Sequence, residues 1–346
     1  MDISDFNYEL PDDLIAQQPL PQRDASRMLV LDRATQSWRD SYFKDLPGEL
    51  AAGDVLVVNN TRVFPARLRG NRFPSGGSIE LLLVRELAPN TWQALARPAR
   101  RLRVGDRLEF DDGALQAEVT GTHANGMRVI QFITDKDLNE FIDRIGEPPL
   151  PPYIRNDNRK LRDDRSRYQT VYAAHRGAIA APTAGLHFTP SILQTLESRG
   201  VRIAQITLHV GYGTFEPVRV RDIAKHQVAA EQFSISETAA SIINEARTRG
   251  RKTIAVGTTT SRALESTVTP NGLVQSAESG IASLTIVPGY QFRAIDGLLT
   301  NFHLPASSLL ILVSAFAGRE FVLRAYEHAV KERYRFYSYG DCMLII

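Results

Sequence analysis

The feature that most restricts the possible folds is residues 63–131, which consist almost entirely of short strand-like runs. Turn pairs such as Gly76-Gly77, Asp112-Gly113 and Asn125-Gly126 separate these runs, and such pairs favour hairpins. Helical periodicity is absent here. The runs are 66–68, 79–84, 91–96, 107–110, 115–119 and 127–133. They predict a small antiparallel β-barrel or sandwich.

The rest of the chain alternates between apolar strand-like runs and helical segments, which is typical of α/β layers. We expect strands at 28–31, 55–58, 202–210, 253–256 and 342–346. We expect helices at 137–145, 191–199, 237–249, 306–317 and 320–333. A stiff proline-rich segment at 148–152 indicates a domain boundary. The prediction is a mixed-sheet α/β main domain, residues 1–62 and 152–346, with an inserted small antiparallel β-barrel domain, residues 63–151.

Composition limits the classes of protein that this chain can belong to. Hydrophobic residues make up 43% and charged residues 23%, as in ordinary soluble domains. The formal net charge is only +2, so binding to nucleic acid would depend on local patches. The single cysteine, Cys342, excludes an internal disulfide. A signal peptide is not recognisable, and the most apolar stretch, 309–317, is shorter than the roughly 20 residues of a membrane span, so we expect a cytoplasmic protein with no membrane partner.

Residues 178–190 predict a strand, a loop and the start of a helix. The apolar run 178–181 is typical of a buried strand, and Pro182 ends it because proline has no N–H for a sheet. We expect Gly185 to take a positive φ in a tight turn, and Thr189 and Pro190 to begin a helix. Ligands bind at such corners of α/β sheets, although a plain connection with a structural histidine fits as well. Residues 299–305 repeat the design around His303.

Candidate site residues recur at the predicted ends of strands. They are Asn59, Thr61, Arg62, Thr183, His187, His209, Glu216, His226, Glu231, Thr258, Thr259, Arg262, Asn301 and His303. A loop histidine with a pKa near 6.5 can act as an acid or a base at neutral pH. The chain has no G-x-G-x-x-G after a strand, no Walker A motif and no histidine or cysteine pair with zinc spacing. We therefore predict no metal site.

Two segments concentrate positive charge. Residues 97–107 contain Arg97, Arg100, Arg101, Arg103 and Arg107, with Asp106 as the one acidic residue. Phosphate contacts would explain this concentration, and so would an exposed sheet edge kept soluble by arginine. The second segment, 155–167, is polar and basic, and fits either an RNA-binding or a simply solvated loop.

Several segments, in this order, resemble the S-adenosylmethionine:tRNA ribosyltransferase-isomerase family of queuosine biosynthesis. They are Asp24-Ala25-Ser26-Arg27, Asn60-Thr61-Arg62-Val63, Tyr168-Gln169-Thr170-Val171-Tyr172, and residues 181–188, 209–215, 256–259, 300–305, 314–318 and 335–341. After His226 the family usually has a methionine and a second histidine, where this chain has Val228 and Ala229. Val287 also replaces a common aromatic residue.

The resemblance implies a specific reaction. The family transfers the ribosyl unit of S-adenosylmethionine to 7-aminomethyl-7-deazaguanine at the wobble position of tRNA and isomerises it, giving epoxyqueuosine, adenine and methionine. S-adenosylmethionine is consumed as a co-substrate, and no cofactor is expected. The implied partner is a tRNA with a GUN-type anticodon, and we expect a monomer.

The resemblance also suggests roles for the candidate residues. His187, His303 and Arg62 are the predicted catalytic residues. Thr258, Thr259 and Arg262 would hold the methionine end of S-adenosylmethionine, and Asn59 would orient a sugar or a base. The other candidates would bind substrate, and Arg97, Arg100, Arg101 and Arg103 would contact tRNA phosphates. A non-catalytic RNA-binding module and an ordinary RNA methyltransferase are the alternative functions.

Overall fold

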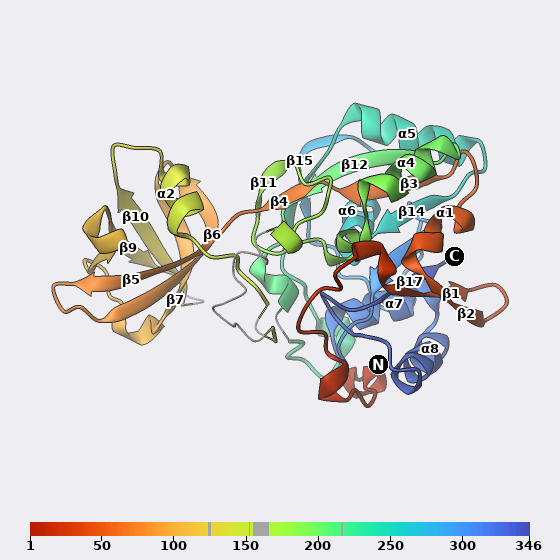
Figure 1. The fold of residues 1–346 in the computed structure, drawn as a ribbon, viewed down its shortest axis with the longest axis horizontal. Coiled ribbons are helices and arrows are strands. Elements are labelled where there is room, and N and C mark those ends of the chain that lie inside the picture. Colours follow the sequence, from red (N-terminus) through yellow and green to blue (C-terminus); the bar gives the residue numbers. More distant parts are fainter. Residues whose placement is uncertain (124–125, 152, 155–165, 216) are drawn as a thin grey trace. The chain divides into compact units, whose positions relative to one another are not determined.

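We describe the protein from a computed structural model (Figure 1). The structure describes residues 1–123, 126–151, 153–154, 166–215 and 217–346. Glu216, most of the basic segment 155–167 and the predicted boundary at residue 152 lie outside the described residues. The chain divides into two compact units. The first contains Met1–Arg62, Tyr153, Ile154 and residues 167–346, and the second contains residues 63–151 and Ser166.

A nine-stranded mixed sheet forms the centre of the first unit. In spatial order its strands are β15 (Ala277–Ala282), β13 (Glu231–Ile235), β12 (Arg202–Leu208), β3 (Val55–Asn59), β14 (Thr253–Val256), β16 (Gly297–Asn301), β17 (Cys342–Ile345), β1 (Arg27–Asp32) and β2 (Ser37–Tyr42). This sheet confirms the predicted mixed-sheet α/β class.

The strand directions bring distant segments to one edge of this sheet. Strands β12, β3, β14 and β16 are parallel, so their carboxyl ends meet at the same edge. β17 runs antiparallel to β16, and β1 is parallel to β17. The amino ends of β17 and β1 therefore lie at that edge too, and Asn301 pairs with Cys342 in register.

Helices cover both faces of the sheet, because successive apolar side chains of β3 point to opposite faces and both sets are buried. Val55 and Val57 belong to one buried cluster, and Leu56 and Val58 belong to a second cluster on the opposite face. The first cluster packs against α5 (Glu237–Thr248), α6 (Thr258–Thr267), α7 (Ser308–Ala317) and α8 (Arg319–Lys331). The second packs against α1 (Leu46–Glu49) and α4 (Pro190–Ser198). No helix among the described residues is long and apolar enough to cross a membrane.

The second unit is a closed antiparallel barrel, as the sequence predicts. Its strands, in order around the barrel, are β10 (Arg128–Ile133), β7 (Thr91–Arg97), β6 (Ser78–Ala88), β5 (Arg67–Phe73), β8 (Arg107–Phe110) and β9 (Leu115–Thr122). Alternate residues such as Ile79, Leu81 and Leu83 are buried along β6. Helix α2 (Leu138–Ile145) follows the last strand and is capped by Asp137.

Three local predictions need correction. The strand β11 (His175–Ala178), which pairs with β4 (Thr61–Val63), ends where the sequence predicted a strand to begin. Gly185 lies in a 3-10 helix, η7 (Thr183–His187), without a positive φ; glycine is required because a Cβ there would lie 2.2 Å from the Tyr172 hydroxyl. Helix α7 begins at Ser308 and not at Ala306, because Ser307 caps it.

Candidate functional site

The predicted site residues of the first unit gather at one edge of the large sheet. Asn59 ends β3, His209 follows β12, Thr258 follows β14, and Asn301 ends β16. Residues Thr183 and His187 belong to η7, which contacts β16. The spatial association predicted for the corners around residues 183–187 and 301–303 is therefore present.

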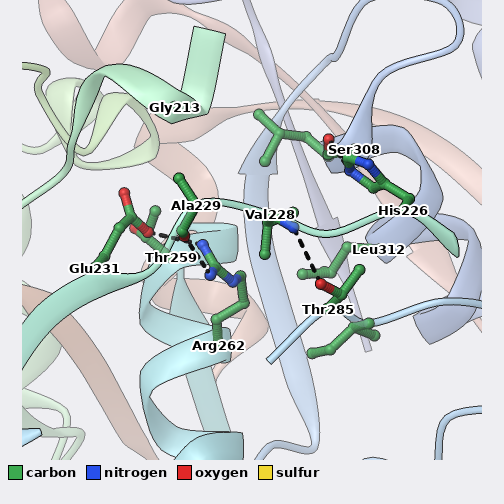
Figure 2. Close-up of a pocket in the computed structure, with 12 residues that line it drawn as sticks. Gly213, His226, Val228, Ala229, Glu231, Thr259, Arg262, Thr285, Ser308 and Leu312 are labelled. Atoms are coloured by element: carbon green, nitrogen blue, oxygen red, sulfur yellow. Dashed lines mark hydrogen bonds and ion pairs between the residues drawn. The ribbon is translucent and has the colours of Figure 1, made fainter. Parts of the chain in front are cut away.

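A first cavity of about 520 Å³, counting its mouth, lies between β13, α6 and α7. Its lining residues are Gly213, His226, Val228, Ala229, Glu231, Thr259, Arg262, Thr285, Ile286, Ser308, Leu309 and Leu312. Figure 2 shows Glu231 and Arg262 on one side and His226 and Ser308 on the other, with Val228 and Ala229 between them. Four sequence-predicted residues thus share one cavity.

A buried ion pair forms one wall of the first cavity. Arg262 Nη1 donates to Glu231 Oε2 at 2.7 Å, and Glu231 Oε1 accepts from the N–H of Gly211. The other bonds of the guanidinium go to the carbonyls of Leu284, Ala229 and Ala282. Burial lowers the pKa of Arg262, and Glu231 opposes that shift. Because Arg262 already makes these four bonds, its main visible effect is to fix the wall of the cavity.

The opposite wall contains a histidine. His226 Nε2 lies 2.7 Å from Ser308 Oγ, and burial lowers the pKa of His226. The backbone N–H of Val228 donates to Thr285 Oγ1. Val228 and Ala229 face the cavity where the resembling family usually has larger side chains. The smaller side chains leave this cavity more open than a methionine and a histidine would.

The amino end of helix α6 adjoins this cavity through Thr259. Gly257 precedes the helix with a φ of 92°, and no side chain caps the helix. The N–H groups of Thr258 and Thr259 have no acceptor among the residues that the structure describes. Free N–H groups at a helix amino end favour a carboxylate or a phosphate.

A second cavity of about 290 Å³, also counting its mouth, lies at the same edge of the sheet, beside the amino end of β1. Its lining residues are Pro19, Leu20, Arg23, Ser26, Arg167, Leu186, His187, Ser338, Tyr339 and Gly340. Arg23 donates to the carbonyls of Gln169 and Leu186, and Arg167 donates to those of Pro21 and Leu20. The two arginines give this cavity a positive potential.

His187 is held from both sides of its ring. Its Nδ1 lies 2.9 Å from Ser26 Oγ, and its Nε2 lies 3.1 Å from Asn301 Oδ1. Burial lowers the pKa of His187, whereas the bond to Asn301 and the charge of Asp341 act in the opposite direction. The imidazole is therefore neutral and oriented at pH 7.

His303 has a different environment, although the sequence places it at a similar corner. Its Nε2 lies 2.9 Å from Thr300 Oγ1, and its backbone N–H donates to the Tyr326 hydroxyl. It lines neither of the two cavities. Burial lowers the pKa of His303 to about 3. Its catalytic role stays a prediction.

The residues around the end of β3 are joined by hydrogen bonds. The Asn59 amide donates to the carbonyl of Leu208 and accepts from the N–H groups of Thr61 and Leu208. Thr61 Oγ1 lies 2.8 Å from His209 Nδ1, and burial lowers the pKa of His209. Arg62 is exposed, and Thr183 is partly buried. Hydrogen bonds of Asn59, Thr61 and His209 thus connect the ends of β3 and β12.

The predicted phosphate-binding residues lie on the barrel. Arg97, Arg100, Arg101 and Arg103 are exposed, and within the described ranges none of them forms an ion pair. Asp106, their acidic neighbour in the sequence, pairs instead with Arg72 at 3.2 Å. The positive charge of this segment is therefore available to a polyanion.

Part of the second cavity is formed by residues outside the predicted set. Ser26, Arg23 and Arg167 line it but were not predicted as site residues. The segment Asp24-Ala25-Ser26-Arg27, one of the family-like motifs, was the available signal. Within the described ranges, no group of three or more histidine, cysteine, aspartate or glutamate residues has metal-binding geometry.

Known proteins are similar to this chain over almost its whole length. A family model described as queuosine biosynthesis protein matches residues 3–345. Two relatives named S-adenosylmethionine:tRNA ribosyltransferase-isomerase, from Halothermothrix orenii and Caldanaerobacter subterraneus subsp. tengcongensis, are each 48% identical. The first comparison covers 100% of both chains and the second covers 99% of both.

A solved structure gives the same result. The crystal structure of S-adenosylmethionine tRNA ribosyltransferase from Thermotoga maritima is 36% identical, with a TM-score of 0.56. The comparison covers 99% of this chain and 100% of that chain. The family resemblance in the sequence motifs is therefore confirmed, and the chain belongs to the queuosine biosynthesis protein family.

Proposed function

We propose that this protein is an S-adenosylmethionine:tRNA ribosyltransferase-isomerase that acts in queuosine biosynthesis. The observation that carries the proposal is the 48% identity to relatives of that name over the full length of the chain. The two cavities at one edge of the sheet support it, since the reaction has to bring a sulfonium nucleoside and a tRNA nucleotide together. S-adenosylmethionine and tRNA are its substrates.

The first cavity is the proposed site for S-adenosylmethionine. The amino end of α6, with its free N–H groups at Thr258 and Thr259, favours the methionine carboxylate. The Glu231–Arg262 pair holds the neighbouring wall, and His226 supplies a neutral imidazole on the opposite wall. The methionine carboxylate could bind to these backbone N–H groups without pairing with a charged side chain.

The second cavity is the proposed site of proton transfer. His187 is neutral, oriented and in contact with the cavity. A sulfonium acidifies the hydrogens on the adjoining carbon, so a positioned base can begin the reaction. Helix η7, which contains His187, adjoins the turn into α6, since a Cβ built on Gly257 would lie 3.9 Å from the Cβ of Ala184.

The finer features of the reaction belong to the same proposal. The tRNA has a GUN-type anticodon and carries 7-aminomethyl-7-deazaguanine at the wobble position, and the products are epoxyqueuosine-tRNA, adenine and methionine. The protein works as a cytoplasmic monomer and without a separate cofactor. The exposed arginines of the barrel contact the tRNA phosphates.

One assay separates this function from the two alternatives. The protein is incubated with S-adenosylmethionine and tRNA bearing the aminomethyl base, and the small products are identified by mass spectrometry. Free adenine and methionine in equal amounts support the proposal. S-adenosylhomocysteine would identify a methyltransferase instead, and tRNA binding without turnover would identify a binding module.

A further inference from the structure

Ser26 is a buried hydroxyl on the wall of the second cavity. It lies directly before β1, in the edge of the sheet where β16 ends, and only 4% of its surface is exposed. Its Oγ lies 2.9 Å from His187 Nδ1, and both residues line the same cavity. A serine hydroxyl in contact with a buried imidazole and with an open cavity is placed to exchange protons with a ligand.

Asn301 determines which nitrogen of His187 carries the proton. The Asn301 Nδ2 group donates to the carbonyls of Tyr337 and Ser338, at 2.8 and 3.2 Å. Its Oδ1 therefore faces His187 and can only accept, so His187 Nε2 must carry a hydrogen. In the neutral ring Nδ1 is then an acceptor, and Ser26 must donate to it.

Ser26 also has a second acceptor. Its Oγ lies 3.3 Å from the carbonyl oxygen of Arg23, which is longer than the bond to His187. If His187 takes up a proton on Nδ1, that N–H can donate to Ser26 Oγ, and the hydroxyl hydrogen can turn to Arg23. Both protonation states of the pair thus have complete hydrogen bonds.

We infer that Ser26 is a catalytic residue, which passes a proton between the substrate and His187 while Asn301 acts as the positioning residue. This inference rests on the proposed function. The substrate's X–H bond breaks, its electron pair stays on X, and its proton forms a new O–H bond on Ser26. At the same time the original hydroxyl proton moves from Ser26 to His187 Nδ1. One proton leaves the substrate, the serine remains a neutral hydroxyl, and the imidazole becomes an imidazolium.

The surroundings determine how easily that imidazolium forms. Burial lowers the pKa of His187 most, the bond to Asn301 and the charge of Asp341 raise it, and Arg335 and Arg23 lower it further. The Asp341 carboxylate is fixed by the backbone N–H groups of Arg27 and Arg335. The lowered pKa of His187 therefore favours return of the proton to a departing group such as adenine.

The test compares Ser26→Ala with Ser314→Ala under steady-state conditions. Ser314 is equally buried, on α7, and its Oγ has no hydrogen-bond partner among the described residues. We expect Ser26→Ala to lower kcat about 10²- to 10⁴-fold with little change in the KM for S-adenosylmethionine. Ser314→Ala should keep near-normal turnover.

Two further variants distinguish proton transfer from a structural role. Because the two residues act as a unit, Ser26→Ala/His187→Ala should be no slower than the slower single variant. Ser26→Cys should retain part of the activity with an altered pH profile, since a thiol is more acidic than a hydroxyl. Effects that multiply in the double variant, or a kcat of Ser26→Ala within about threefold of normal, would overturn the inference. A wild-type enzyme that releases no adenine would overturn the proposed function itself.

Discussion

His187 and His303 have similar sequence contexts but different surroundings in the structure. Both follow apolar runs and lie in polar loops, which is why the sequence predicts both as catalytic. His187 touches a cavity and a hydroxyl, whereas His303 is enclosed by Thr300, Tyr8 and Tyr326. The two side chains are equally buried, so they differ in their neighbours, such as Ser26 for His187 and Tyr8 for His303, which are far away in the sequence.

Replacing His187 by alanine should abolish most turnover. We expect kcat to fall about 10²- to 10⁴-fold because the proton acceptor is lost. Adenine release measures the rate, and circular dichroism checks that the fold persists. The matched control is His175→Ala, which removes an exposed imidazole. A near-normal rate for His187→Ala would remove this residue from the mechanism.

The buried His303 should make stability depend on pH. Its pKa is about 3 in the folded protein and near 6.5 in the unfolded chain. Between these two pKa values only the unfolded chain binds the proton. The contribution of neutral His303 to the free energy of unfolding is therefore complete above about pH 6.5 and is lost as the pH falls below that value. The loss is about 1.4 kcal/mol per pH unit for one group.

Urea denaturation between pH 7 and 4.5 tests this expectation. The free energy of unfolding of His303→Gln should fall less steeply with decreasing pH than that of the natural protein. His187 contributes in the same direction, because its pKa is also lowered by burial. Equal slopes for the two proteins would show that His303 is already protonated in the folded state.

The ends of helices and strands determine the site more than their interiors do. The sequence predicted the strands 28–31, 55–58 and 253–256 and the helix start at Thr189 and Pro190, because short apolar runs and capping are local signals. It missed β2, β13 and β15, which lie toward the two sides of the sheet. Ser26 belongs to a family-like motif, but its contact with His187 could not be predicted, because its position depends on the directions of β17 and β1.

The turn into α6 should control the binding of S-adenosylmethionine. Gly257 has a φ of 92°, which disfavours any residue with a Cβ, so alanine should turn the N–H groups of Thr258 and Thr259. We expect Gly257→Ala to raise the KM for S-adenosylmethionine about tenfold. Gly289→Ala is the control, because Gly289 has a φ of 100° with nothing near its absent Cβ. Similar KM values for both variants would argue against an anion site at α6.

The whole molecule combines near-neutral total charge with a local excess of arginine. The formal net charge is +2, yet residues 97–107 of the barrel unit contain five exposed arginines. The closed barrel was predictable because its strands alternate locally and are joined by short turns. The sequence could not show that Asp106 pairs with Arg72 and so leaves the segment's charge uncompensated.

Charge reversal in this segment should weaken tRNA binding. We expect Arg100→Glu/Arg101→Glu to raise the Kd and to lower the salt slope of log K by roughly 1 to 2, as two phosphate contacts are lost. Arg85→Glu/Lys136→Glu makes the same change in net charge at two other exposed positions of the barrel unit. Binding is measured by filter retention from 50 to 300 mM salt. Identical slopes for the two double variants would assign the phosphate contacts elsewhere.

The position of β17 between β16 and β1 has a consequence for how this protein reaches its native state. The N–H of Arg27 bonds to the carboxylate of Asp341, a residue 314 positions later, at the point where β1 and β17 begin to pair. Such distant pairing forms slowly, since the ends of a very long loop must meet before any contact can offset the loss of chain entropy. Until β17 pairs with β1, the hairpin of β1 and β2 has an unpaired strand edge, and we expect chaperones or aggregation to act there on the refolding chain.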